Sequence, residues 1–294
     1  MFHTGLLLAL LAATGYTLAS FFLKLAVLRH AKPSQLNLMA NLALALIAQP
    51  FWLFDDPSKL NAHPILPLIT CLAFLAGQYF TFWALANGDV SIATPLLGTK
   101  VLGATAINAA VFTVPIPPQW WLASLAAFIG IATVAWGAPG VPIRSAIQSG
   151  IFAIASALFF SLTDVLVQNW AGAFDPFPFL ATMFGGVGIL STLINILFDN
   201  QALRLHRDSV PPLAAGSLLL GLQAVLVFLA LAWTRDATAT NIVYSTRSLI
   251  TILAARAIGS HFGLREAALP RQILVLRLAG ALSLFIAIIL ILTA

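Results

Sequence analysis

Two cationic residues occupy matching places in stretches that should form hydrophobic helices. The segment 89–100 reads D-V-S-I-A-T-P-L-L-G-T-K, and 147 positions later the segment 236–247 reads D-A-T-A-T-N-I-V-Y-S-T-R. Each begins with an acid and ends in threonine followed by a cation. Because each leads into a long apolar run, Lys100 and Arg247 should lie roughly eight or nine residues inside a helix, about 12 Å deep.

A buried ammonium and a buried guanidinium are suited to holding an anion. A charged side chain at the centre of a membrane helix costs roughly 2.5 to 3.5 kcal/mol, and such residues face a cavity or a partner. The ammonium is a compact charge, whereas the guanidinium is a planar fork that matches carboxylate or phosphate. We therefore predict an anion site between Lys100 and Arg247. The alternative is that each pairs with a carboxylate or extends to the membrane surface.

Other polar residues should line this site. Thr240, Tyr244, Arg247 and Thr251 are spaced by four, three and four residues, which places them on one face of a continuous helix. Glutamines occupy similar places in the two halves, and they would bind either a solute or a neighbouring helix; these are Gln78 and Gln223.

One acid lies well inside an apolar segment. Asp164 is expected about four turns into its helix, where a carboxylate needs a reason to be buried. It would serve either as the counter-ion of Lys100 or Arg247, or as a proton-coupling carboxylate. The two roles predict different solutes, because a proton-coupled site at Asp164 would favour neutral or cationic compounds.

Composition indicates a membrane protein. The 294 residues are 61% hydrophobic and 8% charged, with a mean hydropathy of +1.00, whereas soluble domains carry about 25% charged residues. The net charge of +5 is scattered and forms no basic patch, so nucleic acid is not an expected partner. The single cysteine, Cys71, has no partner for a disulfide within the chain.

The apolar segments predict an all-α membrane protein with ten transmembrane helices. A bilayer core needs roughly 20 apolar residues per helix, and windows of that size fall at 5–28, 36–54, 65–86, 92–114, 119–138, 149–170, 177–198, 210–234, 238–260 and 271–293. We divide the chain into a first five-helix repeat (1–139), a linker (140–148) and a second repeat (149–294). An odd number of helices per repeat inverts the second one in the membrane, which is typical of alternating-access carriers.

The repeat extends to the first helix of each half. Residues 13–24, ATGYTLASFFLK, align at an offset of 144 with residues 157–168, ALFFSLTDVLVQ. In this alignment, Ser20 corresponds to Asp164. The identities are few, so the shared positions matter more than the residue types.

These features resemble the drug/metabolite transporter superfamily, EamA type. The likeness rests on F-x-x-K at Phe21–Lys24, on G-D-V-S-I-A-T-P at 88–95, and on the run 244–251 with the trailing L-x-E at 264–266. The family's usual glutamate after the fourth helix is replaced here by Val114-Pro115-Ile116-Pro117. The resemblance implies a carrier for a small-molecule solute.

The basic residues in the loops and the family resemblance imply opposite orientations of the chain in the membrane. One set of loops holds six basic residues and the other holds two, which would place both termini outside; the first set is Arg29, Lys32, Arg144, Arg204, Arg207 and Arg265, and the second is Lys59 and Arg235. The resemblance implies cytoplasmic termini, and we adopt that orientation in the plasma (inner) membrane. The oligomeric state is not predicted.

The sequence thus predicts a secondary active transporter, an exporter or exchanger of a solute with a carboxylate or phosphate, such as an amino acid. The alternatives are proton-coupled efflux of neutral or cationic drug-like compounds through Asp164, with a proton or counter-substrate as coupling partner, and a non-transporting scaffold. No enzyme is expected, since the chain has no H-E-x-x-H or G-x-S-x-G motif. We predict no catalytic residue, cofactor or metal.

Overall fold

The structure is a computed structural model that describes residues 2–54, 63–86, 96–112, 116–135, 143–171, 175–198, 204–258 and 271–293. Every regular element in these ranges is a helix, so the predicted all-helical fold is confirmed. The elements are α1 (Phe2–Leu28), α2 (Pro33–Ala48), η1 (Gln49–Leu53), α4 (Ile65–Ala86), α6 (Lys100–Val111), α7 (Pro118–Ala135), α8 (Ile143–Leu166), η2 (Val167–Ala171), α10 (Pro176–Phe198), η3 (Arg207–Ser209), α11 (Val210–Thr234), α12 (Ala237–Ser245), α13 (Arg247–Ile258) and α14 (Arg271–Leu292).

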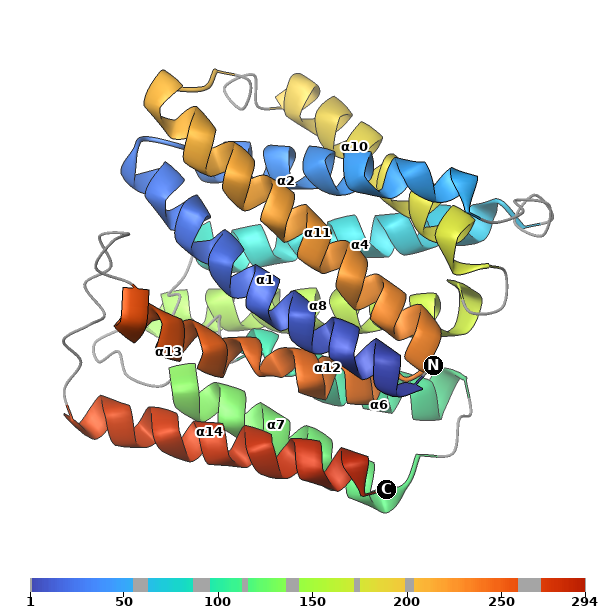
Figure 1. Cartoon of the computed structure of the whole chain (residues 1–294), viewed down its shortest axis with the longest axis vertical. Helices are drawn as coiled ribbons and strands as arrows, with labels where there is room; N and C mark the ends of the chain where they lie inside the picture. The colour runs from blue at the N-terminus through green and yellow to red at the C-terminus, as the bar shows by residue number, and fades with distance from the viewer. Residues whose placement is uncertain are drawn as a thin grey trace.

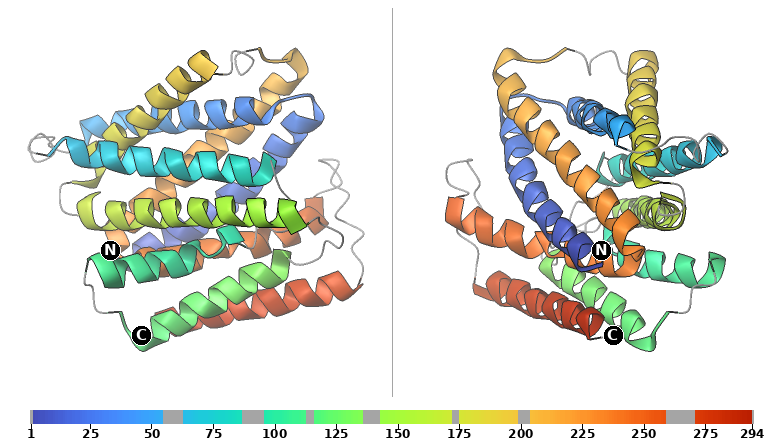
Figure 2. Two further views of the ribbon diagram at one scale, coloured as in Figure 1. Left: turned by 180° about the vertical axis from the view of Figure 1, so that it is seen from behind. Right: turned by 45° about the vertical axis from the view of Figure 1, so that its right-hand side comes forward.

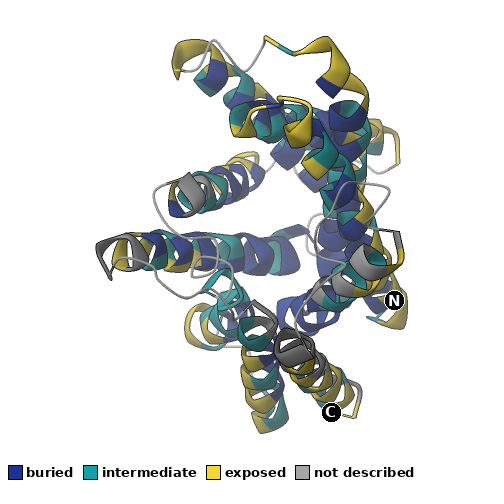
Figure 3. Ribbon diagram, turned by 90° about the vertical axis from the view of Figure 1, so that its left-hand side faces the viewer, coloured by how far each residue is buried: buried dark blue, intermediate teal, exposed yellow. Residues whose placement is uncertain are grey.

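The helices have the length and surface that a bilayer requires. Five of those in the described ranges are long and apolar enough to cross a membrane; they cover 2–28, 33–53, 147–171, 176–198 and 207–234. Helices satisfy their own backbone hydrogen bonds, which lipid cannot do. Exposed positions lie on the outer sides of the bundle (Figure 3), and many of them are large apolar residues such as Leu7, Leu46 and Ile189.

The packing pairs helices of one half with helices of the other. Helices α1 and α11 run side by side across one face (Figure 1), and α4 packs on α8 in the corresponding way. Helices α2 and α10 pair at one edge, whereas α7 and α14 pair at the opposite edge (Figure 2). Both ends of the described chain lie at the same end of the bundle (Figure 1), as an even number of spans requires. The inverted orientation of the repeats stays a prediction.

Small residues allow the helices that carry the site to approach closely. A Cβ added to Gly221 of α11 would lie 2.8 Å from the backbone nitrogen of Leu44 on α2. A Cβ added to Gly103 of α6 would lie 2.5 Å from the hydroxyl of Ser161 on α8. Small residues at membrane helix crossings are expected for this reason, and the second contact fixes α6 against α8.

Two boundaries differ from those expected. Helix α8 begins at Ile143, inside the segment predicted as the linker, while residues 136–142 lie outside the described residues. The predicted helix 238–260 is interrupted, because α12 ends at Ser245 and α13 begins at Arg247. The division into repeats at 1–139 and 149–294 stays a prediction.

Candidate functional site

The interruption between α12 and α13 arises from two adjacent hydroxyl residues. The Ser245 hydroxyl donates to the Ile242 carbonyl at 2.6 Å, and the Thr246 hydroxyl donates to the Val243 carbonyl at 2.7 Å. The Thr246 amide bonds Val243 rather than Ile242. Such local bonds compete with the helical pattern. Arg247 is therefore the first residue of α13 and not an interior residue of one continuous helix, which corrects that part of the prediction.

Lys100 is likewise the first residue of its own helix. Gly98 and Thr99 form a turn, the Thr99 hydroxyl donates to the Leu96 carbonyl at 2.7 Å, and α6 begins at Lys100. Residues 89–95 lie outside the described residues. The amino end of a helix carries partial positive charge, so a cation there is disfavoured until an anion joins it. Both cations thus stand where an anion would be stabilised.

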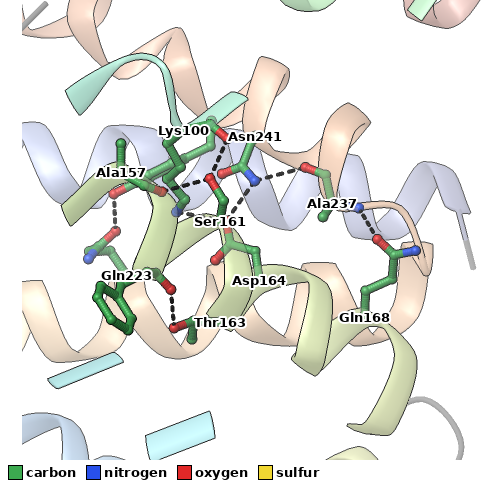
Figure 4. A network of polar contacts seen from close by, with 11 residues as sticks. Lys100, Ala157, Ser161, Thr163, Asp164, Gln168, Gln223, Ala237 and Asn241 are labelled. Carbon is green, nitrogen blue, oxygen red and sulfur yellow. Dashed lines mark hydrogen bonds and ion pairs between the residues drawn. The ribbon is translucent and has the colours of Figure 1, made fainter. Parts of the chain in front are cut away.

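Lys100 is neutralised by a carboxylate from another helix. Its Nζ lies 2.7 Å from Oδ2 of Asp164 on α8, and the same oxygen accepts a 2.7 Å bond from Nδ2 of Asn241 on α12 (Figure 4). The Asp164 side chain is 1% exposed and that of Lys100 is 22% exposed. The Oδ1 atom of Asp164 is buried without a hydrogen-bond partner. Asp164 was expected to be either a counter-ion of Lys100 or Arg247 or a proton-coupling carboxylate. In the structure it forms an ion pair with Lys100.

Arg247 is surrounded by aromatic rings instead. Its guanidinium carbon lies 4.6 Å from the ring centre of Tyr16 on α1 and 4.3 Å from that of Tyr244 on α12. The two rings are nearly perpendicular, at 84°. The Tyr244 hydroxyl donates to Oε1 of Gln223 on α11 at 2.7 Å. No described carboxylate forms an ion pair with Arg247, although Asp164 acts on it electrostatically.

The two cations have matching neighbours at the offset of 144. Lys100 Nζ lies 5.6 Å from the ring centre of Phe160, just as Arg247 lies over Tyr16. The next residue also bonds the helix that the cation begins, although in a different way: Ser161 donates to the Lys100 carbonyl at 2.8 Å, and Thr17 shares a 2.9 Å hydrogen bond with the Thr251 side chain of α13. The contacts around α6 and α13 thus correspond in part.

Not all predicted site residues gather here. The site contains Lys100, Asp164, Gln223, Tyr244 and Arg247, and the bond to Thr17 places Thr251 on the turn after Arg247. Thr240 is fully buried and instead bonds the Thr234 hydroxyl at 2.9 Å.

Gln78 belongs to another part of the bundle. It exchanges 2.8 Å and 2.9 Å hydrogen bonds with Asn41. It also lines a small pocket of about 150 Å³ between α2, α4 and α10, whose other lining residues are Ser34, Asn37, Tyr79, Ile194, Asn195 and Phe198.

Sequence reasoning missed two residues of the polar network. Asn241 holds Asp164, and Gln168 accepts bonds from Asn108 at 3.0 Å and from the Ala237 amide at 2.8 Å (Figure 4). The available signal was an amide inside an apolar span, which usually faces the bundle interior. In the part of the chain that the structure describes, no three His, Cys, Asp or Glu residues form a metal-binding group.

Comparison with known proteins agrees with this architecture. Residues 3–136 match the model of the EamA-like transporter family. No curated protein sequence matches the chain. A solved structure titled "Crystal structure of protein" superposes with a TM-score of 0.78, covering 99% of this chain and 98% of that chain at 14% identity. That likeness is one of fold.

Proposed function

We propose, from the match of residues 3–136 to the model of the EamA-like transporter family, that this membrane protein is a secondary active carrier of a small organic anion. It would export or exchange the solute across the plasma membrane by alternating access between its two halves. The solute carries a carboxylate or a phosphate, as an amino acid or a sugar phosphate does.

The observation that carries this proposal is the state of Arg247. Within the described residues, the other cation of the site has a carboxylate partner at 2.7 Å, whereas Arg247 contacts two neutral tyrosines, the ring of Tyr16 and the ring and hydroxyl of Tyr244. Cation–π contacts compensate a guanidinium only in part, by about 0.5 to 2 kcal/mol. The guanidinium N–H groups that do not bond Tyr244 would serve a bidentate anion, which is the strongest kind of hydrogen-bonded pair.

The surroundings of Arg247 support binding from several helices at once. Tyr16 comes from α1, Tyr244 from α12 and Gln223 from α11, while Arg247 begins α13. A solute held among four helices of the bundle senses their relative positions. Rocking of one half against the other would therefore change its access to the two sides of the membrane.

The experiment is transport by the purified protein in liposomes. Vesicles preloaded with unlabelled pyruvate, alanine or glycerol 3-phosphate are given the same labelled compound outside. A carrier shows saturable uptake and counterflow for at least one of these solutes. Arg247→Gln should abolish the flux, and Arg247→Lys should restore part of it. Arg204→Gln, which removes an exposed cation between α10 and α11, is the matched control and should leave the flux unchanged. Anion flux that persists in Arg247→Gln contradicts the proposal.

A second candidate function rests on the free oxygen of Asp164. Its buried Oδ1 has no partner, so the carboxylate could accept a hydrogen bond from a cationic or neutral drug-like compound in a proton-coupled cycle. In that case Asp164→Asn abolishes drug efflux and Arg247→Gln does little. A non-transporting scaffold would show no flux for any solute in the same vesicles.

A further inference from the structure

We propose that the site selects its solute by charge: it accepts a group with one negative charge in preference to a doubly charged phosphate monoester, and Asp164 sets this limit. The inference rests on the proposed function, in which the anion binds at Arg247. It narrows the solute class from carboxylate or phosphate to a carboxylate.

The charges of the site add up to one. Lys100 and Arg247 each contribute a positive charge, and Asp164 contributes a negative one. The remaining contacts of these three are neutral: Asn241 on Asp164, Phe160 beside Lys100, and the two tyrosines on Arg247. In the described ranges, no other charged side chain forms an ion pair or hydrogen bond with Lys100, Asp164 or Arg247.

Lys100 cannot readily serve a second negative charge. Its ammonium is held by Asp164, and the same carboxylate oxygen also accepts a hydrogen bond from Asn241. If the solute took Lys100, the Asp164 carboxylate would remain buried without its counter-ion, which is strongly destabilising. The ion pair therefore leaves one cation, Arg247, to balance the solute.

Because Asp164 is buried, the net charge of the site should determine which anions bind. The Asp164 side chain is 1% exposed, so water and salt screen it poorly and its electrostatic effect on Arg247 persists. A monoanion at Arg247 brings the site to neutrality. A dianion would leave an unbalanced negative charge that interacts with the buried carboxylate of Asp164. The second negative charge should therefore lower the affinity of the solute for the site.

The test compares ligands that share a body and differ in charge. Benzoate and benzenesulfonate are monoanions of different shape, and phenyl phosphate is close to doubly charged at about pH 7.5. Dissociation constants are measured by thermal shift on the purified full chain at constant ionic strength. Acetate, methanesulfonate and methyl phosphate form a second set for a narrower cavity. The sulfonates separate charge from planar geometry.

The variants change the net charge of the site in steps. Asp164→Asn raises it to two, the double variant Lys100→Met/Asp164→Asn keeps it at one without the ion pair, and Arg247→Gln lowers it to zero. Wild type should bind both monoanions about tenfold or more tighter than the phosphate. Asp164→Asn should strengthen phosphate binding by about tenfold, the double variant should return to the wild-type preference, and Arg247→Gln should lose all three ligands.

Different failures have different meanings. If Asp164→Asn leaves the preference unchanged, or if the double variant behaves like Asp164→Asn, charge counting is wrong while an anion site at Arg247 still stands. If no anion binds, or Arg247→Gln binds all of them as wild type does, the proposed function fails at this site. The double variant also answers the objection that Asp164→Asn misfolds, since it leaves no charge of the pair unbalanced.

Discussion

Lys100 and Arg247 end the two similar segments 89–100 and 236–247, yet the groups around them differ. Each begins a helix after a turn that contains threonine. Each also lies beside an aromatic ring of another helix, Phe160 of α8 for Lys100 and Tyr16 of α1 for Arg247. Four residues after that ring, the first-half cation meets Asp164, whereas the position aligned with Asp164 on α1 is Ser20. The acid thus accompanies a cation with a carboxylate partner, and the hydroxyl accompanies a cation that has no such partner among the described residues.

Under the proposed function, this difference would let two similar halves bind one anion rather than two. If both halves carried the acid, both cations would be neutralised internally. If neither did, two buried charges would each cost roughly 2.5 to 3.5 kcal/mol with no partner. The observed arrangement lowers that cost for Lys100 and leaves Arg247 without a carboxylate partner among the described residues.

The largest effect should come from removing the cation of the ion pair. Lys100→Met leaves the Asp164 carboxylate, 1% exposed, without a counter-ion, and should lower the free energy of unfolding by about 3 to 5 kcal/mol. Asp164→Asn should cost less, because the remaining ammonium is 22% exposed. Denaturation of the detergent-purified variants measures both. Equal losses, or a double variant no more stable than Lys100→Met, would contradict the pairing.

The sequence predicted the helices well because their cause is local. A span of apolar residues must be helical in a bilayer, and within the described residues every predicted window overlaps a helix or two consecutive helices. The interruption before Arg247 was missed, since Ser245 and Thr246 are compatible with a helix by composition and their hydroxyl bonds appear only in three dimensions.

The contacts among the candidate residues were predicted in part, while their role in binding stays a prediction. The two cations are visible as charges in apolar segments, and Asp164 was named as a partner for either. Which cation it meets depends on helix packing across 64 positions of sequence, and no periodicity encodes that choice. The role of Tyr16 could have been inferred from its alignment with Phe160, whereas Gln78 and Thr240 satisfy their hydrogen bonds elsewhere.

The second prediction concerns a substitution that would give Arg247 the same kind of acidic neighbour as Lys100. Ser20→Asp places a carboxylate at the position that corresponds to Asp164, so Arg247 should gain an internal partner and the site should become neutral. Affinity for benzoate should fall by about tenfold or more, as measured by thermal shift. Ser20→Asn, which has nearly the same shape without the charge, should keep wild-type affinity. Unchanged binding in Ser20→Asp would show that the two environments do not correspond.

A smaller effect is expected at the amide that holds the acid. Asn241→Ala removes a 2.7 Å bond to Asp164 and leaves the Lys100 ion pair in place. Hydrogen bonds to charged groups contribute about 1.5 to 3 kcal/mol, and the lower end applies because the ammonium still binds the same oxygen. Stability should fall while the preference for monoanions persists. A reversal of that preference would mean that the amide, and not the charge, determines selectivity.

The smallest effect concerns the ring beside Arg247. Tyr16→Leu removes a cation–π contact at 4.6 Å and should weaken carboxylate binding by a few-fold, consistent with about 0.5 to 1 kcal/mol. Tyr16→Phe keeps the ring face and should bind as wild type does. If Tyr16→Phe is as weak as Tyr16→Leu, the phenolic hydroxyl and not the ring face is the important group.

The location of a bound carboxylate tests the central claim most directly. Crystals of the protein soaked with 4-bromobenzoate would reveal the ligand through the anomalous signal of bromine. We expect the carboxylate oxygens at about 3 Å from the guanidinium nitrogens of Arg247, with the Lys100–Asp164 pair intact. A carboxylate bound to Lys100 with Asp164 displaced, or bound away from both cations, would contradict the account.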